Sequence, residues 1–382
     1  MEHSITTSDC VAVVASKKTW IEQLAIDQLT YTSSLPGMHY CVGMPDLHPG
    51  RTYPVGAAFF ATEQIYPALI GNDIGCGMSL YQTSMPLRKA KLDKLAKSLK
   101  GVEQQCLKHL DEYIDAFKKD HQLHTSSFDH KLGTVGGGNH FAELQRVEEI
   151  YDAALYQALG LDKSCLQLLV HTGSRGFGQS ILLAYQSQFQ TQSLRCGTHE
   201  FNTYWQQHQQ ALAYAQLNRE LVAEKFMLAL KTKSEMLLDV HHNFIEKIEY
   251  KGITGYLHRK GATPSTQGVV MIPGSRGDFS YLIQPLDAEK SLFSLAHGAG
   301  RKWKRGACKA RLDQRYSMQD LQTTSLGSRV ICQDKTLIYD EAPEAYKSCA
   351  QIIEDMVDAK LIRVIAKFRP VMTYKTEGSC GS

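Results

Sequence analysis

The chain has 382 residues, of which 43% are hydrophobic and 21% charged, the composition of a globular protein with room for one large domain or two ordinary ones. The formal net charge of +3 excludes an overall polycation, so any anionic partner must be held by local clusters. No apolar run is long enough to span a bilayer, Met1–Ser4 do not begin a secretory signal, and the ten cysteines are scattered. We therefore expect reduced thiols, a cytoplasmic location and no membrane partner.

The first third of the chain reads as strands and helices in alternation. The predicted strands cover residues 10–16, 39–50 and 53–61, and an amphipathic helix is predicted at 20–29. The apolar run at 67–70 reads as a buried strand or turn that leads into Asn72–Gly77. Residues 90–120 are lysine-rich and helical by period, with one apolar face formed by Leu92, Leu95, Leu99 and Val102.

Most of the remaining elements share one pattern, in which an apolar strand is followed by a glycine turn that carries a polar group. The predicted elements are strands at 166–170, 269–272, 292–296 and 364–374, and helices at 203–250 and 341–356. His242 falls near the end of the long helical region. Because no repeat or linker interrupts this pattern, we expect one α+β domain over residues 1–382 with one central site.

The most informative stretch is Asn72–Gly77, where Asp73 and Cys76 lie three residues apart among glycines. A carboxylate oxygen and a thiolate together suit a borderline divalent metal, and a thiolate can bridge two ions. Such a hexamer alone is usually an ordinary turn. It becomes a metal-site candidate because histidines elsewhere can complete an oxygen, sulfur and nitrogen set, most of them in glycine-rich settings. The candidate ligands are Asp73, Cys76, His140, His171 and His242.

Glycine-rich turns at four places indicate phosphate chemistry, because such turns expose backbone N–H groups. They lie at 136–138, 173–176, 274–277 and 298–300. Arginines in three of them, and the pair Arg259–Lys260, add cationic points that match phosphate oxygens. A basic run follows at 302–311; such a run is usually a solvated face, but beside a phosphate site it could hold a polynucleotide backbone.

The ordered motifs between Met44 and Lys375 resemble the RtcB family of GTP-dependent RNA ligases. The matching stretches are residues 44–48, 73–77, 132–141, 171–176, 242–243, 258–263, 273–277, 297–301, 341–347 and 369–370. The resemblance implies a distinctive α+β fold with two Mn²⁺ ions in a central pocket. The chain is shorter than the usual family member and is similar to the branch associated with release factor H, which suggests RNA repair.

The resemblance also implies residue roles. Cys76, His171 and His242 would hold one manganese, and Asp73, His140 and the bridging Cys76 would hold the second. His297 would be the nucleophile that GTP guanylylates, with Asp46 holding its other ring nitrogen. The implied nucleotide-binding residues are Asn139, Phe141, Glu143, Ser275, Ser280, His297, Gly298, Gly300, Tyr346 and Lys375. Arg175 and Arg259 would meet RNA phosphates.

The implied reaction joins an RNA 2′,3′-cyclic phosphate or 3′-phosphate end to a 5′-hydroxyl end through an RNA(3′)pp(5′)G intermediate. Two other readings stay open. One is a metal-dependent cyclic phosphodiesterase that does not ligate, and the other is a non-catalytic RNA-binding relative. The need for an activating protein and a functional link to release factor H are further expectations that the residues themselves do not decide.

Overall fold

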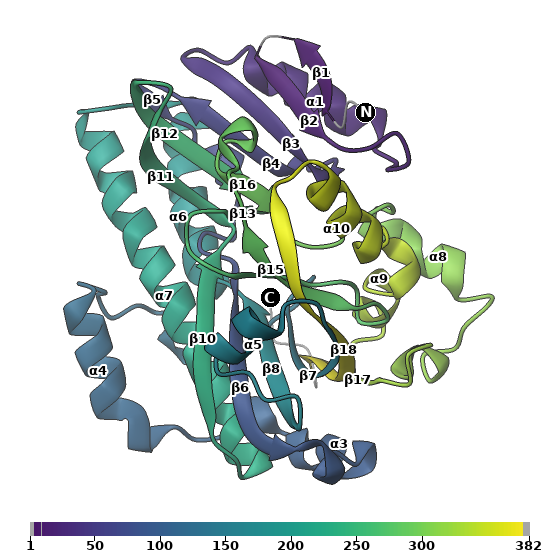
Figure 1. The fold of residues 1–382 in the computed structure, drawn as a ribbon. Coiled ribbons are helices and arrows are strands. Elements are labelled where there is room, and N and C mark those ends of the chain that lie inside the picture. Colours follow the sequence, from purple (N-terminus) through teal and green to yellow (C-terminus); the bar gives the residue numbers. More distant parts are fainter. Residues whose placement is uncertain (1–3, 9, 377–382) are drawn as a thin grey trace.

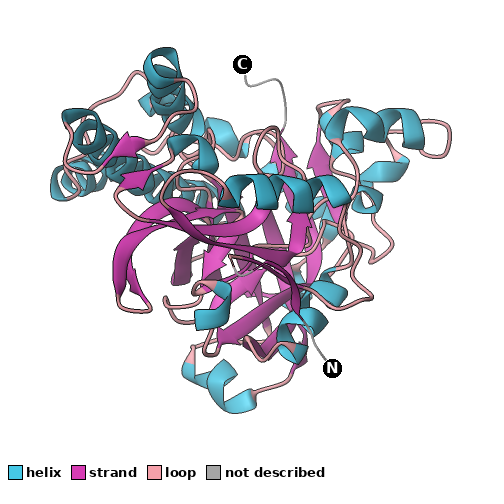
Figure 2. Cartoon of the chain, turned by 90° about the horizontal axis from the view of Figure 1, so that it is seen from above, coloured by secondary structure: helices cyan, strands magenta, loops and turns pink. Residues whose placement is uncertain are grey.

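Two β-sheets form the centre of the protein, and helices surround them (Figures 1 and 2). The structure is a computed structural model and describes residues 4–8 and 10–376. The first sheet has six strands, in the spatial order β1 (Ser4–Ser8), β2 (Val11–Val14), β3 (Met38–His48), β4 (Val55–Ala61), β12 (Ile253–Lys260) and β11 (Asn243–Tyr250). Neighbouring strands are antiparallel except β2 and β3, which are parallel.

The second sheet positions most of the candidate metal ligands, with His171 inside a strand and Cys76, His140 and His242 directly next to strand ends. Its main path runs through β10 (Ser234–His241), β6 (Gly77–Pro86), β8 (Cys165–Thr172), β7 (Phe141–Ile150), β18 (Ile362–Thr376), β15 (Ser280–Pro285) and β14 (Val270–Ile272). These strands are antiparallel to their neighbours, and β17 (Arg329–Cys332) pairs in parallel with β18. Two short pairs complete the strands, β13 (Ala262–Pro264) with β16 (Ser294–Ala296) and β5 (Gln64–Ile65) with β9 (Leu194–Arg195).

The longest helix, α7 (His199–Leu230), packs along β6 and β8 and is the long teal helix in Figure 1. Thr198 caps its N-terminus, because the Thr198 side chain accepts a hydrogen bond from the Phe201 N–H. The other helices are α1 (Gln23–Ser33), α2 (Pro67–Ile70), α3 (Leu92–Leu99), α4 (Asp111–Asp120), α5 (Ala153–Ala158), α6 (Arg175–Phe189), α8 (Cys308–Leu312), α9 (Leu337–Asp340) and α10 (Cys349–Asp358). Helices and sheets of mixed order confirm the α+β class.

The predicted helix at 203–250 is correct only as far as Leu230. Residues 234–250 instead form β10 and β11, and His242 lies between these two strands. Glu235, Met236 and Leu238 favour a helix locally, but β10 pairs along its length with β6, and this long-range pairing overrides the local preference.

Two further boundaries differ from the sequence prediction near the site. Residues 67–70 form the one-turn helix α2, with Pro67 at its start, so Asp73 and Cys76 precede strand β6 instead of ending a strand. The helix predicted at 341–356 begins only at Cys349, because Pro343 starts a separate short turn. The apolar face predicted within 90–120 is confirmed, with Leu95 and Leu99 almost fully buried.

The nine cysteines in the described part of the chain are all free thiols. Within the same residues, no helix combines the length and the apolar character needed to cross a membrane.

Candidate metal centre and nucleotide cavity

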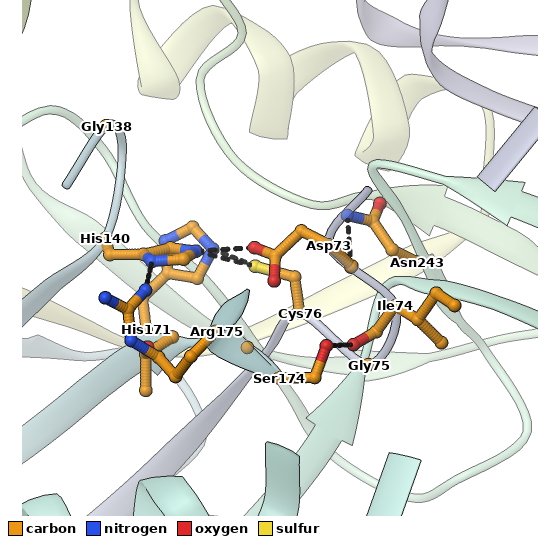
Figure 3. Close-up of polar contacts among 12 residues, drawn as sticks. Asp73, Ile74, Gly75, Cys76, Gly138, His140, His171, Ser174, Arg175 and Asn243 are labelled. Atoms are coloured by element: carbon orange, nitrogen blue, oxygen red, sulfur yellow. Dashed lines mark hydrogen bonds and ion pairs between the residues drawn. The ribbon is translucent and has the colours of Figure 1, made fainter. Parts of the chain in front are cut away.

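The candidate metal ligands meet at one edge of the second sheet, where β10, β6, β8 and β7 lie side by side. Because these strands are antiparallel, the ends of β10 and β8 share an edge with the beginnings of β6 and β7. The register pairs Gly77 with His241 and Thr172, and Phe141 with His171. The residues next to these positions, Cys76, His140 and His242, therefore converge with His171. Figure 3 shows three of these side chains, Cys76, His140 and His171, close together.

The resulting cluster contains two overlapping groups of three potential ligands, each with its ligand atoms within 4.8 Å of one another. The first group is Cys76, His171 and His242, and the second is Asp73, Cys76 and His140, so the sulfur belongs to both. Cys76 Sγ lies 3.3 Å from His171 Nε2 and 3.4 Å from His140 Nε2. His140 Nε2 is 2.7 Å from Asp73 Oδ2. A shared sulfur between two groups is the arrangement that a thiolate bridging two ions requires.

The surroundings keep the imidazoles in the form that binds metal. Burial lowers the pKa of His171 and of His242 well below its usual range, so both rings are neutral. Burial, and then the nearby Asp73, raise the pKa of the Cys76 thiol. Burial is the largest single effect on Asp73 and would raise its pKa, but His140, Cys76 and Arg175 together lower this pKa below its usual value. This donor set suits a divalent cation, whose positive charge would favour the thiolate form of Cys76.

Arg175 holds His140 in one tautomer. Its Nη1 lies 3.3 Å from His140 Nδ1, and a guanidinium can only donate, so Nδ1 accepts and Nε2 carries the proton that faces Asp73. A metal at His140 Nε2 requires the opposite tautomer. The hydrogen bond from Arg175 therefore competes with a cation at His140 Nε2.

His297 lies directly after β16 and beside the metal cluster. Its Nδ1 is 2.6 Å from Asp46 Oδ2, and its backbone N–H donates to the same oxygen at 3.3 Å. Asp46 is fully buried in β3, and the ring centroids of His297 and His242 are 4.9 Å apart. At Gly261, where φ is +59°, a Cβ would come within 2.8 Å of His297 Cε1, so glycine allows this close approach.

A cavity of about 900 Å³ opens in front of these groups. Of the sequence-predicted residues, it is lined by Asp73, Cys76, Asn139, Phe141, Glu143, His171, His242, Ser275, His297, Gly298, Gly300, Tyr346 and Lys375. Ser280 does not line it; this serine is buried in β15 and its hydroxyl accepts a hydrogen bond from Gln145.

Opposite charges are buried together in the part of the cavity lined by Glu143, Tyr346 and Lys375. Burial raises the pKa of Glu143 to about 7 and lowers that of Lys375 to about 8. Lys375 Nζ donates to the Gly138 carbonyl at 2.9 Å and lies 3.7 Å from Glu341. The Tyr346 hydroxyl donates to Glu341. These side chains provide both hydrogen-bond acceptors and a cation, which a nucleotide base and its phosphates need.

Of the two predicted RNA-phosphate contacts, the one at Arg259 needs correction, and the one at Arg175 stays a prediction. Arg259 is fully buried: its guanidinium pairs with Glu246 and also donates to Ser294 Oγ and the Phe293 carbonyl, so it is closed to RNA. Lys260, the next residue of β12, lines the cavity instead, since neighbouring strand residues face opposite sides. Arg175 contacts His140 and Thr134 and does not line the cavity.

Sequence reasoning predicted Arg301 only as a cation for phosphates, and it missed the contacts of Arg301 and Glu341 with Tyr346 in the wall of the cavity. Arg301 Nη1 donates to Glu341 Oε1 at 3.1 Å and to the Tyr346 hydroxyl at 3.2 Å, and its Cζ lies 5.0 Å from the Tyr346 ring centroid. Both residues stood within quoted motifs, but only their contact in space shows that they position Tyr346.

The fold and the site define an α+β protein with a histidine, cysteine and aspartate cluster that could hold metal, beside a histidine held by a buried carboxylate. A family model described as tRNA-splicing ligase RtcB matches residues 28–112 and 102–376. RNA-splicing ligase RtcB2 of Escherichia coli (strain ATCC 25922) is 50% identical over 372 residues, which cover 97% of each chain. The tRNA-splicing ligase RtcB of Methanococcus maripaludis is 28% identical over 446 residues, 93% of this chain and 92% of that one. The chain therefore belongs to the RtcB family.

Proposed function

We propose that this protein is a GTP-dependent RNA ligase that joins 2′,3′-cyclic phosphate or 3′-phosphate ends to 5′-hydroxyl ends, in RNA repair. The observation that carries the proposal is the position of His297. Its Nδ1 is held by Asp46 at 2.6 Å, while its ring lies 4.9 Å from that of His242. Hydrogen bonding of Nδ1–H to a buried carboxylate leaves Nε2 with a free lone pair, which makes this atom the nucleophile of the cavity.

In the first part of the reaction, His297 Nε2 attacks the α-phosphorus of GTP. A phosphorus–nitrogen bond forms, the bond to the β-phosphate oxygen breaks, and pyrophosphate leaves. Asp46 accepts a hydrogen bond from the His297 Nδ1–H during this step, and its carboxylate stabilises the positive charge that develops on the ring. Lys260, Arg301 and Lys375 line the same cavity and supply positive charge for the phosphates.

The second part transfers the nucleotide to RNA. A 2′,3′-cyclic phosphate is first opened by water to a 3′-phosphate, whose oxygen then attacks the histidine-bound phosphorus and breaks the bond to Nε2. The 5′-hydroxyl of the other strand attacks the activated 3′-phosphate, GMP leaves, and a 3′,5′ linkage results. Glu143, when ionised, would accept from the amide edge of guanine, which is the reason that GTP is the proposed nucleotide.

Two Mn²⁺ ions would be held by Cys76, His171 and His242 and by Asp73, Cys76 and His140, and would supply neutralisation of phosphate charge during in-line attack. The neutral imidazoles of His171 and His242 support this assignment, since only unprotonated rings bind metal.

The test is covalent labelling with GTP that is radioactive at its α-phosphate, in the presence of Mn²⁺. We expect a labelled protein from the wild type and a loss of roughly three orders of magnitude or more in His297→Ala, because no other group replaces the nucleophile. His199→Ala is the matched control, since His199 is exposed on α7, and it should label normally.

Product analysis on RNA with a cyclic phosphate end and a separate 5′-hydroxyl strand completes the test. Joined RNA is expected from the wild type. A 3′-phosphate product without joining would support the phosphodiesterase alternative, and metal-independent RNA binding without turnover would support the non-catalytic one. Absence of label from the wild type would contradict the proposal.

A further inference from the structure

A strip of cations borders the cavity directly beyond the His297 loop. We call it the basic rim, and it consists of Lys302, Trp303, Lys304, Arg305, Lys309, Arg311 and Arg315. Between Lys302 and Tyr316 the only acidic residue is Asp313. Lys302, Trp303, Lys304 and Arg305 line the cavity itself, so the rim begins inside the site and continues outward.

The rim has a fixed position because its backbone and one face are packed. The N–H groups of Lys302 and Trp303 donate to the Ala345 carbonyl at 2.9 and 3.3 Å. In α8, Cys308 and Leu312 are fully buried, and Leu312 belongs to a small apolar cluster that includes residues of α9. Figure 1 shows α8 beside α9, on the side of the molecule opposite α7. The cations are thus presented from a folded support.

Most of the rim's charge is unneutralised. Arg305 pairs with Glu341 at 3.2 Å, yet about half of its side chain is exposed. Within the described part of the chain, the other five cations form no ion pair with an acidic side chain, and all five are exposed: Lys302, Lys304, Lys309, Arg311 and Arg315. Exposed cations without partners attract a polyanion more strongly than paired ones, because no protein carboxylate competes for them.

Trp303 gives the rim an aromatic surface among these charges. The indole is half-buried at the cavity wall, with Arg311 Cζ 4.9 Å and Lys302 Nζ 5.5 Å from its ring centroid. An aromatic ring set among cations is the combination that binds single-stranded nucleic acid, in which a base stacks on the ring and flanking phosphates meet the cations. A duplex covers the faces of all but its terminal bases and therefore offers far fewer bases to such a ring.

We propose that the basic rim binds a single-stranded stretch of RNA, with one base stacked on Trp303 and phosphates on the rim cations, and so leads an RNA end to His297. The inference rests on the proposed function for the identity of the polyanion as RNA. It adds a binding path for the RNA strand that continues beyond the nucleotide cavity. It also gives a function to the basic run at 302–311, which the metal and nucleotide chemistry do not use.

The experiment measures RNA binding by tryptophan fluorescence, without GTP, so that no ligation occurs. The chain has three tryptophans, and a Trp20→Phe background leaves only Trp205 and Trp303. The probe is a single-stranded RNA of about 12 nucleotides with a 3′-phosphate, a length within the site sizes usual for single-strand binders. We expect binding to quench the fluorescence, and Trp303→Phe to abolish the quenching while fluorescence anisotropy of a dye-labelled probe still reports binding.

The variants separate stacking from charge. Trp303→Ala should weaken binding roughly tenfold, whereas Trp303→Phe should largely preserve it. The triple variant Lys309→Ala/Arg311→Ala/Arg315→Ala should reduce the slope of log affinity against log salt by about two. The matched control is Lys94→Ala/Lys97→Ala/Lys119→Ala, three exposed lysines on α3 and α4, which should leave affinity and slope unchanged. Thermal denaturation of each variant checks that it is folded.

The proposal is overturned if folded Trp303→Ala and the triple rim variant bind the probe as the wild type does, or if a blunt RNA duplex of the same length binds equally well. Equal binding of a polyanionic protein, such as a poly-glutamate chain, would also overturn it. The RNA-binding measurement needs no GTP. Absence of a GMP adduct would therefore contradict the proposed ligase function, but it would leave the test of the basic rim unaffected.

Discussion

Buried side chains with displaced pKa values control the site at the scale of single residues. His171 and His242 are held neutral by burial, and Lys375 and Lys260 each have a pKa lowered to about 8. The two lysines therefore exchange protons just above neutral pH, whereas the two histidines stay unprotonated there. Glu143 belongs to the same class and offers the clearest test.

Glu143→Gln should reduce the pH dependence of stability. Burial raises the pKa of Glu143 from 4.5 to about 7, so between these values the folded protein keeps a proton that the unfolded chain has lost. Stability therefore falls as pH rises through this window, by up to roughly 3 kcal/mol. Urea denaturation at about pH 5 and pH 8 should show this loss in the wild type and much less of it in Glu143→Gln.

The matched control for Glu143 is Glu112→Gln, since Glu112 is exposed on α4. It should follow the wild type at both pH values. Identical pH dependence in Glu143→Gln and the wild type would show that burial does not raise this pKa.

Strand pairing decides which side chains reach the site at the scale of elements. On β12, Arg259 points away from the cavity into the pair with Glu246 on β11, whereas Lys260 lines the cavity. Asn243 links the same strands to the loop that carries Asp73 and Cys76. Its side chain donates to the Asp73 carbonyl at 3.2 Å and accepts from the Gly261 N–H at 2.7 Å. Because side chains alternate along β12, Arg259 forms a buried ion pair and the next residue, Lys260, faces the cavity.

Arg259→Ala should destabilise the protein without changing RNA binding. Removal of the guanidinium leaves Glu246 and the acceptors at Ser294 and Phe293 without their partner, at a cost of about 3 kcal/mol in the free energy of unfolding. Urea denaturation measures this cost. The double variant Arg259→Met/Glu246→Gln should recover part of it, because no unpaired charge remains.

The comparison for this prediction is Arg363→Ala, whose side chain is 56% exposed and lies 3.7 Å from Asp152. It should change stability by less than about 1 kcal/mol. If Arg259→Ala were as stable as the wild type but bound RNA with a smaller salt slope, the original assignment to RNA phosphates would be restored.

The site lies between the two sheets at the scale of the whole molecule. The second sheet supplies the metal ligands at its edge, while Asp46 comes from β3 of the first sheet and holds His297. Metal binding should therefore stabilise the association of several strands, since only the folded chain brings the ligands together.

Addition of Mn²⁺ should raise the melting temperature, and a chelator should reverse the increase. A free ion concentration of about 100 times the dissociation constant adds roughly 2.7 kcal/mol, which corresponds to a few degrees for a chain of this size. Cys76→Ala should lose most of the increase, because Cys76 belongs to both ligand groups. Differential scanning calorimetry measures the shift, and one cooperative transition would also support the prediction of a single domain over residues 1–382.

Cys165→Ala is the control for the metal experiment, because Cys165 is a half-buried thiol outside both ligand groups. It should retain the full increase in melting temperature. An equal increase in Cys76→Ala would show that Mn²⁺ binds elsewhere.

The sequence by itself determined the kinds of residue at the site, the α+β class and the family, because the motifs and apolar patterns lie within short stretches of chain. It placed the strand before His171 correctly, and the ligand types of Asp73, Cys76 and the histidines were visible as motifs.

Only the tertiary structure decided how these residues meet. Pairing with β6 makes β10 a strand and places His242 directly after it, whereas the sequence predicted a helix there. Because side chains alternate along β12, Lys260 lines the cavity and Arg259 does not. Contact with Glu341 holds Arg301 beside Tyr346. The physical reason is that local preferences reflect neighbours along the chain, whereas side-chain direction in a sheet depends on register with strands that lie far away in sequence.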